Sequence, residues 1–88
     1  MPRGLFELSQ YCRKFGGIHF DYKKENSEII AISSGFKLGS IVTSGKDEKE
    51  LDENIKDAIL TFFEIPSSYS KEAKVCKVGE GQREYAIA

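Results

Sequence analysis

The chain has 88 residues, of which 40% are apolar and 31% charged, and its formal net charge is −1. This composition predicts one globular domain over residues 1–88 and excludes a disordered chain, a bilayer-spanning helix and a broadly basic nucleic-acid binder. The first residues show no long apolar stretch, so no signal peptide is predicted and we expect a cytoplasmic protein. Cys12 and Cys76 are interpreted as thiols of a reducing compartment, although one bridge between them is arithmetically possible.

The first half of the chain predicts a helix followed by three strands. Apolar residues recur at helical spacing through Leu5, Leu8, Cys12 and Phe15, and the glycine pair at 16–17 ends the helix. Residues 18–23 alternate between apolar and polar side chains, which is typical of a half-buried strand. A hairpin turn at 24–27 leads to a second strand at 28–33, and a glycine-bounded loop at 34–39 leads to a short third strand at 41–43.

The second half predicts a helix and two further strands. Asp47 and Glu50 form a variant of the capping box, so a helix begins there, and Pro66 predicts its end near Ile65. Residues 67–72 are predicted as a loop, and 73–78 and 82–87 as strands joined by a turn at 79–81. The fold class is therefore α/β in the α+β sense, with an N-terminal helix, a three-stranded antiparallel sheet, a packing helix and a C-terminal strand or hairpin. The apolar stripe of the second helix comprises Leu51, Ile55, Ala58, Ile59 and Phe62.

Residues 28–66 carry a recognisable pattern across the predicted turn into the second helix. Thr43-Ser44-Gly45 is followed by Glu50, then by Asn54, and then by Ala58-Ile59. This pattern resembles the HicB-like antitoxin family, in which Thr-x-Gly precedes a capped helix with Glu, Asn and Ala-Ile. The loop at 38–41 departs from the family, which usually has Pro-Gly-Cys before its threonine, and so do Leu51 and Asp52, where the family has a small and an apolar residue.

The resemblance implies a partial ribonuclease-H-like fold and a role as antitoxin to a small HicA-type toxin that cleaves messenger RNA. Family members often carry a separate C-terminal DNA-binding domain. The 22 residues after Pro66 show no helix-turn-helix pattern, so DNA binding is not expected here. Thr43, Gly45, Glu50, Asn54 and Ala58 are the family-motif residues, and we interpret them first as turn, cap and core positions.

No catalytic, cofactor or metal site is predicted. A ribonuclease H needs several carboxylates converging on Mg²⁺, whereas Asp21 is the one acid on the first strand. His19 with Cys12 and Cys76 lacks the short spacing and the fourth ligand of a zinc site. We therefore expect a binding protein rather than an enzyme.

Two apolar residues of the second helix lie off the stripe that faces the sheet. At about 100° per residue, Leu60 points roughly opposite Leu51, and Phe63 is also displaced. Either the segment from Tyr69 to Val78 covers them, or they belong to an intermolecular surface, and a homo-oligomer, most simply a dimer, is expected. The candidate interface comprises Leu60, Phe63, the acidic residues Asp52, Glu53 and Asp57, and Tyr85 and Ile87 of the apolar terminus.

Three functions remain open from the sequence. The first is an antitoxin-type protein that masks a small basic ribonuclease, steered by Asp52, Glu53 and Asp57. The second is an orphan homo-oligomeric domain with a regulatory or scaffolding role. The third is an RNA-binding module, which the acidic residues Asp47 and Glu48 disfavour because they lie where a double-stranded RNA-binding domain has lysines.

Overall fold

The computed structural model describes residues 3–78 and 83–87. The turn expected at 79–81 and the first residue of the last predicted strand, residue 82, lie outside these ranges. The longer elements are α1 (Arg3–Phe15), β1 (Ile18–Glu25), β2 (Glu28–Ser34), β3 (Val42–Gly45) and α2 (Glu48–Phe62). They are followed by η1 (Ser67–Tyr69), α3 (Ser70–Ala73), β4 (Val75–Val78) and β5 (Glu84–Ile87).

The strands form one antiparallel sheet of five strands in the order β3-β2-β1-β5-β4, which confirms the mixed α+β class. The C-terminal strands extend this sheet instead of forming a separate hairpin, because β5 pairs with the start of β1. Ile18 lies opposite Tyr85 at that junction. The chain therefore returns its C-terminal end to the centre of the sheet.

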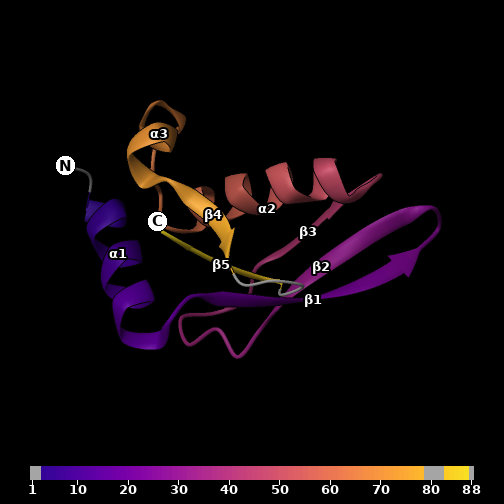
Figure 1. Cartoon of the computed structure of the whole chain (residues 1–88), viewed down its shortest axis with the longest axis horizontal. Helices are drawn as coiled ribbons and strands as arrows, with labels where there is room; N and C mark the ends of the chain where they lie inside the picture. The colour runs from indigo at the N-terminus through magenta and orange to yellow at the C-terminus, as the bar shows by residue number, and fades with distance from the viewer. Residues whose placement is uncertain (1–2, 79–82, 88) are drawn as a thin grey trace.

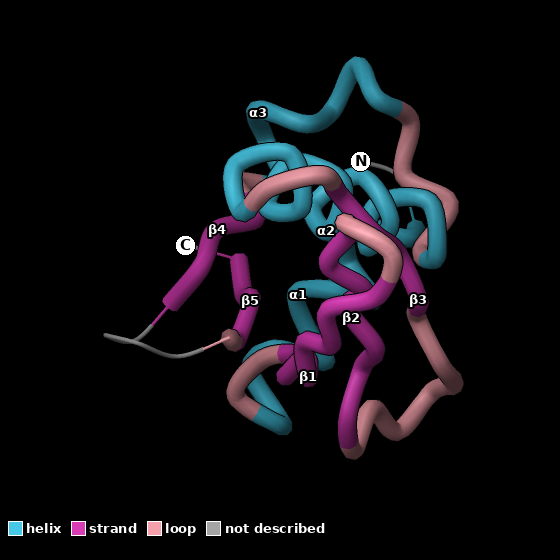
Figure 2. Tube along the Cα trace, turned by 90° about the vertical axis from the view of Figure 1, so that its right-hand side faces the viewer, coloured by secondary structure: helices cyan, strands magenta, loops and turns pink. Residues whose placement is uncertain are grey.

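The two long helices lie on the same side of the sheet. In Figure 1 α2 lies above the strands and α1 stands at one end of the sheet, and Figure 2 shows the same layering after a quarter turn. Phe20 and Ala31 point to the helices and are fully buried, whereas Asp21 and Ile32, one position along each strand, are exposed. This alternation is the consequence of the two-residue period of a strand.

Local backbone signals fix the first two connections. Gly16 adopts φ 89° and donates its N–H to the carbonyl of Cys12 at 2.8 Å, which ends α1 as predicted. Asn26 and Ser27 both have positive φ, 49° and 67°, and join Glu25 to Glu28 in a two-residue hairpin. Two positive φ values in a row define a type I′ turn, whose twist matches that of the strands.

The helix α2 ends at Phe62, three residues before the position that Pro66 predicts. Ile65 donates its N–H to the carbonyl of Leu60 at 2.8 Å, and Glu64 donates to Thr61 at 3.0 Å. These two bonds form a Schellman motif, in which the residue after the cap takes the left-handed conformation. Glu64 occupies that position with φ 55°, where glycine would normally stand.

Three predictions about the helices were wrong. The buried stripe of α1 uses Leu5, Leu8 and Tyr11, while Phe15 is exposed. In α2 Leu60 is buried with Leu51, Ile55 and Ile59, and Phe62 is partly exposed, because the segment after the helix folds back over its last turn. The predicted loop at 67–72 contains η1 and α3, short turns that bury Ala73.

Within the described residues, no helix is long and apolar enough to span a bilayer.

Candidate interaction surface

The family-motif residues meet where β3 passes into α2. Asp47 caps the helix by accepting the N–H of Glu50 at 2.8 Å, and the Glu50 carboxylate accepts the N–H of Lys46 at 3.1 Å. A Cβ on Gly45 would lie 2.5 Å from the backbone nitrogen of Leu51. Glycine is therefore required here by the close approach of the strand to the helix, and φ is not in the left-handed range.

Asn54 fastens α2 to the edge strand. Its Nδ2 donates a hydrogen bond of 2.7 Å to the carbonyl oxygen of Ser44. The N–H of Ser33 binds the carbonyl of Ile41, so residues 41, 43 and 45 direct their backbone groups to β2 and Ser44 directs its own outward. Asn54 thus occupies the Ser44 carbonyl on the free edge of the sheet, so that this carbonyl cannot accept a bond from another strand.

Thr43 and Ala58, the other two motif residues, are both partly buried. Thr43 pairs with Ala31 in the sheet, and Ala58 lies beside the buried stripe of α2. Four of the five motif residues therefore lie on β3 and the first turns of α2, whereas Ala58 lies further along α2, in one hollow with Ile41 and Val42.

A second polar contact ties the C-terminal strand to α2. The Tyr85 hydroxyl donates to Oδ1 of Asp52 at 2.6 Å, and Nζ of Lys56 lies 3.0 Å from Oδ2 of the same carboxylate. Burial alone would raise the pKa of Asp52, but the bonds from Tyr85 and Lys56 outweigh it and lower that pKa. Burial, together with the hydrogen bond to Asp52, raises the pKa of Tyr85.

The predicted interface is corrected on four residues. Leu60 and Phe63 are 7% and 5% exposed and belong to the core, and Tyr85 is fully buried. Asp52 is partly buried and is bound to Tyr85 and Lys56 within the chain. An isolated helix would expose Phe63, but in the fold it packs beside Phe36 and next to Gly4 of α1. Tyr85 is buried because β5 pairs with the start of β1. Glu53 and Asp57 are exposed as predicted, and Ile87 is partly buried.

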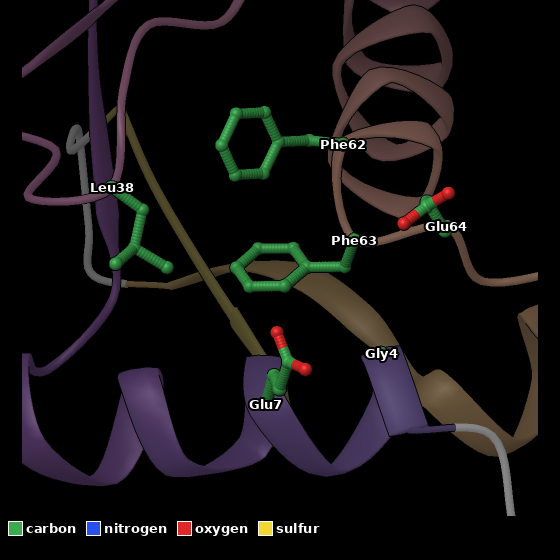
Figure 3. Close-up of a pocket in the computed structure, with 6 residues that line it drawn as sticks. All are labelled: Gly4, Glu7, Leu38, Phe62, Phe63 and Glu64. Atoms are coloured by element: carbon green, nitrogen blue, oxygen red, sulfur yellow. The ribbon is translucent and has the colours of Figure 1, made fainter.

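Exposed apolar side chains gather on a different part of the molecule. Phe62, Leu38 and Glu7 line one hollow, which Figure 3 shows between the end of α2, the loop before β3 and the start of α1. Leu38 and Glu7 also line a second hollow toward the far end of α1, and Phe62 lines a third toward β3. Five of the seven exposed large apolar residues of the described chain line these three hollows: Phe6, Phe15, Leu38, Phe62 and Val42.

We define the α1 groove as Phe6, Phe15, Leu38 and Phe62. The loop that carries Leu38 is anchored by its neighbours, since the N–H of Lys37 binds the Tyr11 hydroxyl at 3.0 Å. Phe36 is buried against Tyr11 and Phe62, with ring centroids 5.0 Å from each. Leu38 is 53% exposed on this fixed loop, and in Figure 3 its side chain points toward the Phe63 side of the hollow.

We define the β3–α2 surface as Val42, Ala58, Glu53 and Asp57. Val42, Ala58 and Asp57 line one shallow hollow, and Val42 is 61% exposed. Ile32 lies opposite Val42 in the sheet and is also exposed. Glu53 precedes Asp57 by four residues, so both carboxylates lie along one face of α2.

Of these two surfaces, only Glu53 and Asp57 were predicted from the sequence, and for most of the other residues a signal existed. Phe6 lies off the apolar stripe of the first helix, and Leu38 stands between two glycines in a loop. An apolar side chain that no periodic pattern accounts for is a candidate for exposure. Phe62 had no such signal, because it fits the stripe of the second helix.

Few of the titratable residues that the structure describes outside these surfaces contact one another. Nε2 of His19 lies 3.4 Å from Oδ1 of Asp21 on the open face of the sheet, and both side chains are largely exposed. In residues 3–78 and 83–87, no group of three or more His, Cys, Asp or Glu side chains is placed to hold a metal ion. Cys12 and Cys76 are free thiols, and burial raises the pKa of Cys12 against a hydrogen bond to Ile87 that lowers it.

Comparisons with protein-family models, with curated proteins and with solved structures found no match. The resemblance to HicB-like antitoxins therefore depends on the motif residues themselves.

Proposed function

We propose that this protein is a non-catalytic, cytoplasmic binding protein of the HicB-like antitoxin type. In this proposal it neutralises a small basic ribonuclease by covering the surface with which that toxin binds RNA. The observation that carries the proposal is the β3–α2 surface, where exposed Val42 and the exposed carboxylate Asp57 line one hollow and Glu53 lies one turn back along α2. A basic partner would find apolar contact there next to opposite charge, which steers its association.

The motif residues support the same proposal. Gly45, Glu50 and Asn54 hold β3 against the start of α2, and these two elements carry the proposed surface. Residues that fix two elements against each other are expected at a binding site built on a rigid scaffold. The resemblance and the surface thus concern the same corner of the fold.

An inhibition assay tests this function. The toxin to use is the product of a neighbouring gene, if that gene encodes a small basic protein with a single histidine. We expect this protein to stop RNA cleavage by the purified toxin at equimolar concentration. The variant Glu53→Lys with Asp57→Lys should weaken inhibition about tenfold or more.

The matched control is Glu25→Lys with Glu28→Lys, which changes the net charge equally at the β1–β2 hairpin. This control should inhibit normally. Cleavage that continues with this protein in excess, or equal inhibition by both double variants, would overturn the proposal.

The RNA-binding alternative gains no support from the start of α2. Glu48 and Glu50 lie in the first turn of that helix. Their negative charges interact favourably with the positive end of the helix dipole and would repel a phosphate group. A gel-shift assay with duplex RNA distinguishes the two functions, and we expect no shift.

A further inference from the structure

We infer that the α1 groove is the site at which two copies of this protein bind each other through a two-fold contact. This inference goes beyond the proposed function and does not depend on it, because Phe6, Phe15 and Leu38 lie outside the β3–α2 surface and only Phe62 borders both. The occupant of the groove is therefore the groove of a second copy, contributed mainly by α1 and the loop around Leu38.

The first support is the area of exposed apolar surface. Phe6, Phe15 and Phe62 are 54%, 45% and 37% exposed. For aromatic side chains of about 150–250 Å² each, these fractions leave about 200–340 Å² in water. With Leu38 this is roughly a third to a half of the ~800 Å² that each partner buries in a standard interface. Polar side chains at the rim would have to supply the rest.

The second support is the distribution of charge along the groove. Lys14 and Lys37 lie at the Phe15 end, where Nζ of Lys14 is 5.4 Å from the centroid of the Phe15 ring. Glu64 lies at the other end, beside Phe62. Leu38 lines the hollows of both halves and so marks the middle.

A groove that is basic at one end and acidic at the other is complementary to itself. In a two-fold contact the same patch of each copy faces the other in the opposite direction. With the axis near Leu38, Glu64 of each copy faces Lys14 of the other, and the apolar side chains meet in between. Glu7, which lines both halves of the groove, lies beside the axis. The formal net charge of −1 per chain adds almost no repulsion between two copies.

Measuring the molecular mass over a concentration series tests the apolar contact of the proposed dimer. Sedimentation equilibrium should show a reversible monomer–dimer equilibrium in the micromolar range. Leu38→Asp should raise the dissociation constant by about tenfold or more, since it places a charge at the centre of the contact. Val42→Asp is the matched control, because Val42 is also an exposed apolar residue but lies outside the groove, and it should leave the dimer unchanged.

A charge exchange tests the orientation. Lys14→Glu and Glu64→Lys should each weaken the dimer, because each places like charges opposite one another. The two single variants mixed together should form a heterodimer, and the double variant should dimerise like the original chain. Arg13→Glu controls for the lost cation in the last turn of α1, because Arg13 does not line the groove.

The outcomes divide clearly. A chain that stays monomeric up to high micromolar concentration, a dimer that Leu38→Asp leaves intact, or one that Val42→Asp disrupts equally would overturn the inference. Cooperative melting of each variant shows whether a loss of dimer is a loss of fold. A monomeric Leu38→Asp variant that still inhibits the toxin would separate this inference from the proposed function.

Discussion

The hydroxyl of Tyr85 donates a hydrogen bond of 2.6 Å to Oδ1 of Asp52, and this contact joins β5 to α2 across 33 positions of the sequence. Tyr85 is fully buried beneath α2, and its ring meets Phe20 edge to face at a centroid distance of 5.8 Å. The contact explains how a strand of four residues holds the end of the chain in the middle of the sheet. It also gives the titratable hydroxyl of Tyr85 a hydrogen-bond partner, the carboxylate of Asp52.

Removing the Tyr85 hydroxyl should destabilise the fold without unfolding it. We expect Tyr85→Phe to lower the free energy of unfolding by about 1–3 kcal/mol, because Asp52 loses a charge-assisted bond in a partly buried position. Urea denaturation measures this difference. Tyr69→Phe is the control, since that side chain is partly exposed, and it should change stability little. Equal losses in the two variants would contradict the assigned role of Tyr85.

The same residue predicts a loss of stability in alkali. The pKa of Tyr85 is raised in the folded state, so folding favours the protonated hydroxyl. This contribution is fully present below the unfolded pKa of about 10 and is lost as pH rises above it. The difference in stability between the original chain and Tyr85→Phe should therefore shrink above pH ~10. A difference that stays constant from neutral pH into this range would be inconsistent with the buried hydroxyl.

Gly45 should tolerate no side chain. A Cβ there would lie 2.5 Å from the nitrogen of Leu51, and the nearest atoms are all backbone. We expect Gly45→Ala to cost about 3 kcal/mol, because strand and helix would have to move apart. Gly35→Ala is the comparison, since Gly35 has open space around its Cα and only its φ of 72° opposes a side chain. It should cost about 1–2 kcal/mol, and thermal melting should rank the two variants in this order.

The end of α2 offers a stabilising change. Glu64 takes the left-handed conformation at the position of the Schellman motif that glycine favours. Glu64→Gly should stabilise the protein by about 0.5–1 kcal/mol, because it relieves that strain. Asp57→Gly, inside the same helix, should instead destabilise it by about 1 kcal/mol. Chemical denaturation that shows both glycines to be destabilising would contradict the cap assignment.

The stability of the protein should depend on the hydrogen-bond donor at position 54. Its Nδ2 binds the carbonyl oxygen of Ser44, so Asn54→Ala should cost about 1–2 kcal/mol. Asn54→Asp should cost more at neutral pH, because a carboxylate oxygen would then face the carbonyl oxygen. Lowering the pH to protonate that carboxylate should bring the aspartate variant closer to the original chain. Equal stability of the two variants at pH 7 would argue against the bond to Ser44.

The sequence by itself determined the local elements, because their signals lie within a few residues of one another. Each of these signals determines the structure of its own segment, and the structure confirms them. They are the alternation at 18–23, the turn after Glu25, the cap at Asp47 and the glycines at 16 and 45.

The tertiary structure alone decided which apolar side chains are covered. Leu60 and Phe63 look exposed on an isolated helix, but both are buried in the fold. Phe63 packs beside Phe36 of the loop before β3 and next to Gly4 of α1. Tyr85 becomes a core residue only because β5 inserts beside β1, a pairing between opposite ends of the chain. Phe62 remains exposed although it fits the apolar stripe of α2. Helical periodicity indicates the direction of a side chain but not what lies in that direction, and burial depends on contacts between residues far apart in sequence.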